Sequence, residues 1–214
     1  MSEHKMINVY FFSRFERLAH WTQMLLIFIL TLTGFEVHGT YKLFGYNTAV
    51  KLHNGAAITW IVMFWLFVFW ALTTGEWKQY IPTTKKVLEV IMFYSYGIFI
   101  GQPHPVKKCK DAKHNPLQRI VYLVVATLIL PIQISTGLLY LLYNSWDKLG
   151  LGFLSLRVVA FLHLAGAVVI ISFVIVHVYM TTTGHTPLAH IMAMITGWEE
   201  VEECAEIEEW ETGK

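Results

Sequence analysis

The sequence predicts an all-α integral membrane protein, a bundle of four transmembrane helices. Hydrophobic residues make up 55% of the chain and charged residues only 14%, a balance that is too apolar for a soluble domain of this length. Four apolar runs are long enough to cross the hydrocarbon core of a bilayer. Trp or Tyr residues lie near their ends, as in an interfacial aromatic belt. We therefore expect one membrane domain over residues 1–198 and an acidic, solvated cytoplasmic tail over 199–214.

The expected spans are 18–37, 53–73, 117–143 and 156–179. No small-residue cleavage site follows the first run, so we expect it to be a permanent span and not a signal peptide. The segment 87–101 is apolar but short, which favours a helix in the middle loop that lies at the membrane interface. After the break at Gly184, residues up to 198 favour an amphipathic segment.

The basic residues predict the orientation. With four spans, both termini and the long middle loop share one side of the membrane. All but four of the sixteen Lys and Arg residues fall on that side, the exceptions being Lys42, Lys51, Lys148 and Arg157. Positive residues stay in the cytoplasm, so we expect both termini to be cytoplasmic in a bacterial or archaeal cytoplasmic (inner) membrane.

The sequence lacks the motifs of several cofactor and phosphate-binding sites. Cys109 and Cys204 are far apart and belong to no C-x-x-C or C-x-x-C-H pattern, so covalent c-type haem and a four-cysteine cluster have no ligands. The sequence also has no glycine-rich phosphate loop. We expect no nucleic-acid partner, and membrane lipid is the expected surroundings.

Histidine is the residue that remains to be explained, because an ionisable side chain inside a span is costly and points to function. His163 and His177 both lie in the fourth span. On an α-helix, fourteen residues place them about 40° apart around the axis and about 21 Å apart along it. His20 begins the first span and His53 begins the second. The topology therefore pairs His20 with His177 near the cytoplasmic face and His53 with His163 near the periplasmic face.

Two imidazoles on different helices at one depth form an axial ligand set for a haem iron. Small residues near them, including Gly34, Gly55 and Gly166, leave room for a flat ring. A single histidine could instead form a hydrogen bond across helices. A zinc site or a proton pathway is expected to add carboxylates at the same depth, and the expected span interiors have none. The pattern favours two b-type haems, with a histidine-lined ion or metal transporter as the more distant alternative.

Four motifs carry a family resemblance: FERLAHW at 15–21, KLHNGAA at 51–57, FLHLAG at 161–166 and IVHVYM at 175–180. They resemble the di-haem cytochrome b subunits of respiratory formate dehydrogenases. The same superfamily contains the cytochrome b subunits of membrane-bound nickel–iron hydrogenases and thiosulfate reductases. The resemblance implies the same pairs, His20 with His177 and His53 with His163.

The resemblance also implies a quinone site at the cytoplasmic face. HNPLQR, residues 114–119, is similar to the stretch that supplies a quinone-binding asparagine in that family. The implied residues are Asn115, with His114 and Gln118 beside it, and the implied substrate is menaquinone or ubiquinone. The same residues also have the pattern of a helix N-terminus, with Asn115 as the cap and Pro116 in the first turn. His185, after the fourth span, is a weaker candidate for contact with a haem propionate or the quinone.

These observations predict a membrane-anchoring subunit of a respiratory oxidoreductase that carries electrons between a periplasmic partner and the quinone pool. The chain has no iron–sulfur ligands, so the primary substrate site must lie on another chain. The formate dehydrogenase-like direction is inward, from a periplasmic iron–sulfur subunit to the quinone. The alternative is quinol oxidation, with electrons passing outward to a periplasmic multihaem c-type cytochrome.

Overall fold

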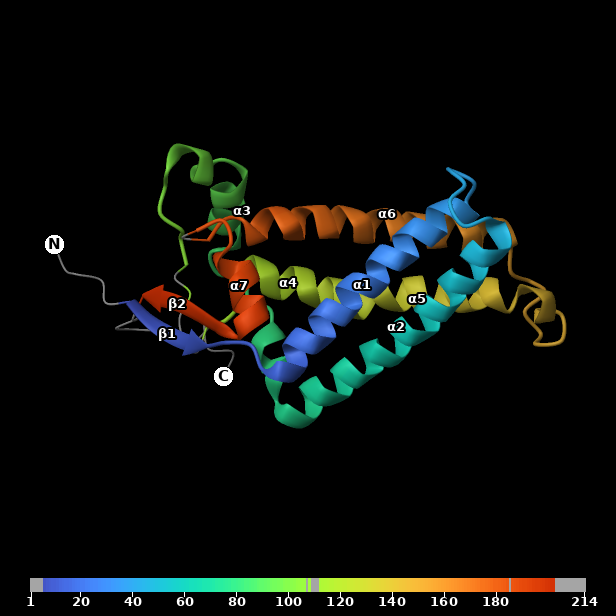
Figure 1. The fold of residues 1–214 in the computed structure, drawn as a ribbon, viewed down its shortest axis with the longest axis horizontal. Coiled ribbons are helices and arrows are strands. Elements are labelled where there is room, and N and C mark those ends of the chain that lie inside the picture. The colour runs from blue at the N-terminus through green and yellow to red at the C-terminus, as the bar shows by residue number, and fades with distance from the viewer. Residues whose placement is uncertain (1–5, 107, 109–111, 185, 203–214) are drawn as a thin grey trace. The chain divides into compact units, whose positions relative to one another are not determined.

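A computed structural model describes residues 6–106, 108, 112–184 and 186–202, and helices account for most of it (Figure 1). Four helices are long and apolar enough to cross a membrane: Arg14–Val37, Tyr46–Thr74, Pro116–Leu141 and Leu156–Thr181. The predicted fold class is confirmed, although the second helix begins seven residues earlier than its expected start at His53. The chain divides into two compact units, which are described separately.

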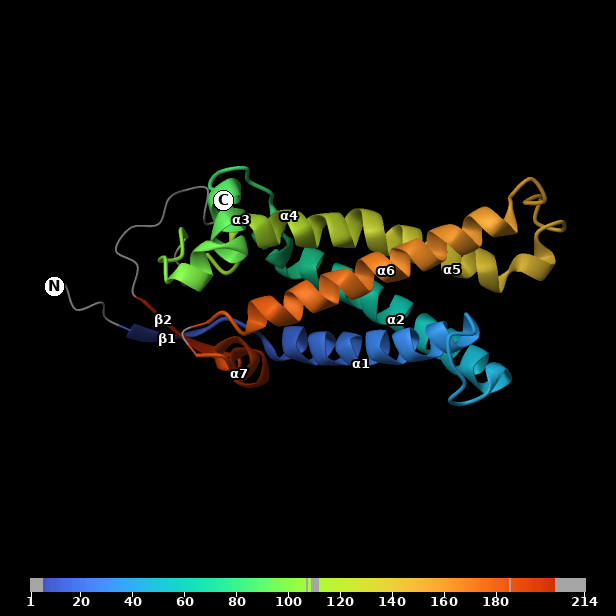
Figure 2. The same ribbon diagram turned by 90° about the horizontal axis from the view of Figure 1, so that it is seen from above.

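The first unit, called the helical unit, consists of Phe15–Phe69 and Leu128–Met180. It contains most of α1 (Arg14–Val37), α2 (Tyr46–Thr74) and α6 (Leu156–Thr181), all of α5 (Leu130–Leu141) and the short η4 (Tyr143–Ser145). Helices α1 and α2 follow one another in opposite senses along the long axis of the view (Figures 1 and 2). Val159 is the one residue of α6 buried against protein, whereas Phe161 and Ile175 are about two-thirds exposed. Such apolar, exposed surfaces are suited to contact with lipid.

The third span changes helix type along its length. It consists of α4 (Pro116–Val124), the π-helical segment η3 (Val125–Ile129) and α5. Pro131 has no N–H to donate to the carbonyl four residues before it, which disfavours a regular α-helix at this point. The wider π-helical turn accommodates the proline without breaking the span. The span therefore remains one candidate transmembrane helix from Pro116 to Leu141.

A buried carboxylate joins α1 to α2. Gly39 adopts a left-handed conformation, with φ of 89°, and ends α1 there. The Glu36 side chain, 4% exposed, then accepts backbone hydrogen bonds from Leu43, Phe44 and Gly45, each at 2.8 Å. These N–H groups immediately precede α2, where donors have no partner within the helix. The negative charge also complements the positive end of the α2 dipole.

The second unit, called the terminal unit, consists of the described residues of Met1–Arg14, Trp70–Thr127 and Thr181–Lys214. Strand β1 (Met6–Tyr10) pairs antiparallel with β2 (Trp198–Glu202), with Tyr10 opposite Trp198. Val9, Phe11 and Val201 form a small buried core under this sheet. The sheet was not predicted from the sequence.

The sheet also corrects the expected solvated tail. Glu199 was placed at the start of that tail, but it lies in β2 and is 6% exposed. Pairing with β1 supplies its backbone hydrogen bonds, and the packing of Val201 beneath the sheet holds the strand in place. The remainder of the expected tail, 203–214, lies outside the described residues.

Short helices complete the terminal unit. They are η1 (Glu76–Tyr80), α3 (Val87–Ser95), η2 (Gly97–Ile100), α4 and α7 (Ala189–Thr196). The predicted middle-loop helix is present as α3, which buries Val90 and Phe93 and packs against α4. The predicted amphipathic segment is helical only from Ala189. His185 lies outside the described residues.

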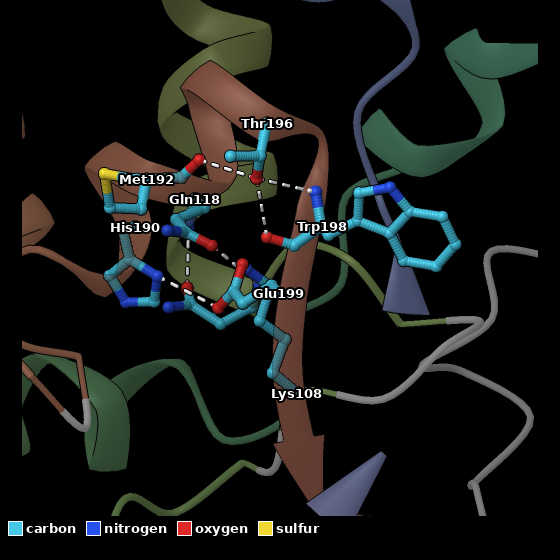
Figure 3. A network of polar contacts seen from close by, with 8 residues as sticks. Lys108, Gln118, His190, Met192, Thr196, Trp198 and Glu199 are labelled. Carbon is cyan, nitrogen blue, oxygen red and sulfur yellow. Dashed lines mark hydrogen bonds and ion pairs between the residues drawn. The ribbon is translucent and has the colours of Figure 1, made fainter. Parts of the chain in front are cut away.

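One ionic network ties β2 to the rest of the terminal unit (Figure 3). Lys108 Nζ donates to Glu199 Oε2 at 2.5 Å, and His190 Nδ1 is 3.0 Å from Glu199 Oε1. Burial alone would raise the pKa of Glu199. The hydrogen bonds and charges of His190 and Lys108 outweigh burial and hold the pKa of this carboxyl below its ordinary value. Glu199 is therefore stabilised as a carboxylate.

Glu36→Gln should lower the melting temperature of the detergent-solubilised protein. A neutral amide presents one acceptor oxygen and two donor hydrogens to a turn whose backbone groups are all donors. Thermal unfolding followed by circular dichroism measures the effect. The exposed Glu89 on α3 provides a control, since Glu89→Gln should leave the melting temperature unchanged. Equal melting temperatures for Glu36→Gln and the unmodified protein would contradict the role of Glu36.

Glu199→Gln should destabilise the protein by about 1.5–3 kcal/mol at neutral pH, the typical contribution of hydrogen bonds to a charged group. The folded-state pKa of Glu199 is lower than its unfolded value of 4.5, so its contribution is present above that value and is lost as the pH falls through the folded pKa. Melting curves recorded over a pH series should therefore show a weaker acid dependence for Glu199→Gln. Glu200→Gln, an exposed neighbour on the same strand, should behave as the unmodified protein. An unchanged acid dependence in Glu199→Gln would argue against the network.

Candidate cofactor sites

The helical unit brings the four predicted histidines together as the two predicted pairs. The rings of His20 on α1 and His177 on α6 have centroids 6.1 Å apart. The rings of His53 on α2 and His163 on α6 have centroids 6.4 Å apart. Helix α6 thus contributes one imidazole to each pair, as the fourteen-residue spacing predicted.

The spacing of each pair suits two axial ligands of one metal. An imidazole nitrogen binds a transition metal at about 2.0–2.1 Å, so rings on opposite sides of one metal have centroids about 6 Å apart. Within the part of the chain that the structure describes, no group of three or more His, Cys, Asp or Glu side chains is placed to hold a metal ion. Two imidazoles are the complement that a protein supplies to an iron already bound by a porphyrin. The donor set therefore fits haem.

A threonine holds each imidazole of the His53/His163 pair. Thr33 Oγ1 on α1 lies 3.0 Å from His53 Nδ1, and Thr136 Oγ1 on α5 lies 3.1 Å from His163 Nδ1. Both threonines are buried, with 1% and 5% of their surface exposed. In both rings Nδ1 is engaged, so Nε2 is the nitrogen available for a metal.

Each of these threonines is followed by a glycine that contacts the same ring. A Cβ atom added to Gly34 would lie 3.2 Å from Cε1 of His53, and one added to Gly137 would lie 3.1 Å from Cε1 of His163. Of the small residues noted in the sequence, Gly34 therefore makes room for a histidine ring. Gly166 instead accommodates the amide of Gln133, and a Cβ at Gly55 would meet nothing within 4 Å.

The His20/His177 pair has different surroundings. His20 Nδ1 is buried and has no hydrogen-bond partner. The ring of His20 makes an edge contact with Trp21, and that of His177 stacks on Phe173 with centroids 5.7 Å apart. Each histidine of this pair thus has an aromatic neighbour, as His163 has in Tyr140, whose ring centroid is 6.2 Å away.

The predicted quinone residues lie in the terminal unit, at the start of α4. Asn115 Oδ1 accepts from the backbone N–H of Gln118 at 2.9 Å, and Gln118 Oε1 accepts from the N–H of Asn115 at 3.0 Å. This reciprocal pair is a capping box, with Pro116 in the first turn. The predicted helix start is therefore confirmed. The Gln118 oxygen is used by the cap, whereas the Asn115 amide nitrogen lies 3.4 Å from the Tyr94 hydroxyl.

His114 lies between two tyrosines. Its ring centroid is 5.3 Å from that of Tyr80 and 5.4 Å from that of Tyr122, and its Nδ1 is buried without a hydrogen-bond partner. Burial lowers the pKa of His114 well below its usual value, and the charges of Lys113, Lys108 and Arg119 lower it further. The imidazole is consequently neutral at physiological pH.

Tyr94 connects the Asn115 amide to a second histidine. His104 Nε2 is 3.3 Å from the Tyr94 hydroxyl, while His104 Nδ1 lies 2.5 Å from the carbonyl oxygen of Val106. Burial also lowers the pKa of His104, although the Val106 contact opposes this shift. Asn115, Tyr94 and His104 thus form a continuous polar chain in the terminal unit.

Sequence reasoning missed Thr33, Thr136, Tyr94 and the role of His104. Both threonines occur as a Thr-Gly dipeptide in the helix before a ligand candidate, 20 and 27 residues from His53 and His163. Thr-Gly occurs elsewhere in the sequence as well, so the available signal is a Thr-Gly dipeptide that lies wholly inside a span. Tyr94 and His104 have no comparable local pattern, because their contact with Asn115 depends on the packing of α3 against α4.

Comparison with known proteins gives the family. The family model for prokaryotic cytochrome b561 matches residues 11–197. An Escherichia coli (strain K12) protein named "Putative cytochrome YdhU" is 30% identical over 201 residues, which cover 89% of this chain and 74% of that protein. No solved structure matches the chain. The chain therefore belongs to the prokaryotic cytochrome b561 family of multi-pass membrane proteins, which bind b-type haem and transfer electrons.

Proposed function

We propose that the chain is the di-haem cytochrome b subunit of a respiratory oxidoreductase and carries electrons across the membrane. His20 and His177 hold one b-type haem, and His53 and His163 hold the other. The observation that carries this proposal is the presence of two imidazole pairs with ring centroids 6.1 and 6.4 Å apart in a chain of this family. Each bound haem supplies reversible one-electron chemistry.

The protein fixes where these reactions take place. Because α6 supplies a ligand to both pairs, the fourteen residues from His163 to His177 set a spacing of about 21 Å along that helix. Thr33 and Thr136 orient the imidazoles of one pair, and Trp21 and Phe173 enclose the other. The apolar exterior of the spans is suited to lipid, which would keep water away from these pairs and limit competing reactions.

The distribution of Lys and Arg supports an orientation with both termini in the cytoplasm of a bacterial or archaeal inner membrane. In this orientation the His53/His163 pair lies toward the periplasm and the His20/His177 pair toward the cytoplasm. The electron donor is a periplasmic iron–sulfur subunit of another chain, in the arrangement of a formate dehydrogenase. The acceptor is menaquinone or ubiquinone from the membrane pool.

The quinone binds beside His114 and Asn115 at the start of α4. Reduction of a quinone to a quinol takes up two electrons and two protons, so the site requires a proton supply as well as a hydrogen-bond donor. The Asn115 amide is the donor, and the Tyr94 hydroxyl and His104 imidazole that follow it can pass protons from the cytoplasm. The aromatic rings of Tyr80 and Tyr122 provide an apolar wall next to His114.

His163→Ala and His177→Ala should each remove one of two haems, leaving about half of the haem per polypeptide, since each variant deletes one axial ligand of a different pair. Reduced-minus-oxidised visible spectra and haem quantification of the purified protein measure the loss. The matched control is His38→Ala, an exposed histidine that follows α1, which should retain both haems. Colourless unmodified protein from haem-supplied cells would refute the proposal.

Asn115→Ser should slow electron exchange with quinone by about tenfold, the equivalent of one hydrogen bond. Serine preserves the N-cap of α4 but removes the amide donor, so stability and haem content should not change. Stopped-flow oxidation of the reduced cytochrome by a soluble quinone analogue measures the rate. The exposed Asn144 in η4 provides the control, Asn144→Ser. An unchanged rate in Asn115→Ser would remove Asn115 from the quinone site.

A further inference from the structure

We propose that Thr33 and Thr136 fix the tautomer of His53 and His163 and thereby lower the redox potential of the haem that this pair holds. The inference rests on the proposed function, because it concerns the haem that His53 and His163 are proposed to hold. Both threonines are positioning residues that act through the imidazoles. The arrangement occurs twice, in α1 against α2 and in α5 against α6, with the same atoms in contact.

The direction of the hydrogen bonds follows from the number of available hydrogens. A threonine hydroxyl has one hydrogen and accepts through its oxygen. Thr33 Oγ1 lies 2.7 Å from the Ile29 carbonyl oxygen, and Thr136 Oγ1 lies 2.8 Å from the Ile132 carbonyl oxygen. A carbonyl oxygen can only accept, so each hydroxyl hydrogen is given to the helix backbone. The imidazole Nδ1 must then donate to the threonine oxygen.

This assignment leaves Nε2 unprotonated in both rings, so that its lone pair can bind iron; at His163 the iron would replace the present contact of Nε2 with the Gln133 amide. A contact at His163 supports the same tautomer. The amide nitrogen of Gln133 lies 3.4 Å from His163 Nε2. In this orientation the amide nitrogen donates, which is compatible with an Nε2 that accepts.

The glycine after each threonine allows the histidine ring to pack closely against the helix. The Cα atoms of Gly34 and Gly137 bring the backbone against Cε1, the atom between the two ring nitrogens. A larger side chain at either position would contact the ring within about 3.2 Å and displace it from the hydroxyl. Each Thr-Gly pair therefore sets both the orientation and the protonation of its histidine.

No such threonine contact is found at the His20/His177 pair among the described residues. His20 Nδ1 is buried there without a hydrogen-bond partner, and the His177 ring contacts the rings of His20 and Phe173. An imidazole that donates its N–H to an oxygen is a more basic ligand. Greater basicity stabilises the oxidised iron and lowers its potential. Electrons therefore pass favourably from the His53/His163 centre to the His20/His177 centre, which is the direction required for quinone reduction.

The test is a redox titration of the haem-loaded protein. The wave that is missing in His163→Ala is assigned to the His53/His163 haem, and the remaining wave to the His20/His177 haem. Thr33→Val and Thr136→Val keep the side-chain volume and remove the hydroxyl. Each should raise the midpoint potential of the His53/His163 wave and leave the other wave unchanged, and the double variant should raise it further. Thr33→Ser and Thr136→Ser should restore the original potential. The matched control is Thr59→Val on α2, whose hydroxyl bonds only to the Gly55 carbonyl among the described groups.

Thr33→Val could instead lose the haem while Thr33→Ser retains it. That result would also support the inference, because the serine variant keeps the hydroxyl and the valine variant does not. An unchanged potential in the valine variants would overturn it, as would equal shifts in the valine and serine variants. A His53/His163 wave at higher potential than the other wave in the unmodified protein would overturn the stated direction. Failure of the proposed function is distinct, since the unmodified protein would then show fewer than two haems or His163→Ala would lose none.

Discussion

Every polar group at membrane depth must find its partner within the protein, because lipid offers no hydrogen bonds. This constraint accounts for most of the structural detail in the spans. The hydroxyl oxygens of Thr33 and Thr136 each lie within hydrogen-bond distance of a carbonyl oxygen of their own helix and of a histidine Nδ1 on another helix, so that one atom serves two polar groups. The same constraint explains the π-helical turn before Pro131, which keeps the third span helical where a hydrogen bond is lost. His20 Nδ1, which is buried without a partner among the described residues, is the exception at the two histidine pairs.

Helix α6 is the element on which both candidate sites depend. The 3.6-residue period places His163 and His177 on nearly the same face, and the helix contributes little buried protein surface apart from Val159. Its role is therefore to position ligands rather than to supply a tightly packed core. The partner histidines come from α1 and α2, which are joined through the carboxylate of Glu36. Each pair therefore depends on how one of these two helices packs against α6.

The features that the sequence predicted are those encoded by local periodicity. The four spans follow from runs of apolar residues, the histidine pairs from helical geometry and alternating direction, and the N-cap at Asn115 from its own neighbours. The sheet could not be predicted in this way, because β1 and β2 are five residues each and lie at opposite ends of the sequence. Composition also suggested a solvated Glu199, whereas its burial depends on Lys108 and His190. The Thr-Gly pairs are visible in the sequence, but their meaning depends on which helix faces which histidine.

The difference between the two histidine pairs bears on how such a chain directs electrons. Two bis-imidazole centres with identical surroundings would have similar potentials, and the direction of flow would depend entirely on the partners. Here a threonine hydroxyl lies beside each histidine of one pair, whereas Trp21 and Phe173 contact the histidines of the other. Hydrogen bonds to ligands and burial are two of the means by which a protein adjusts a haem potential. A difference in potential between the two proposed haems would thus be set by the helices of this chain and not by its partners alone.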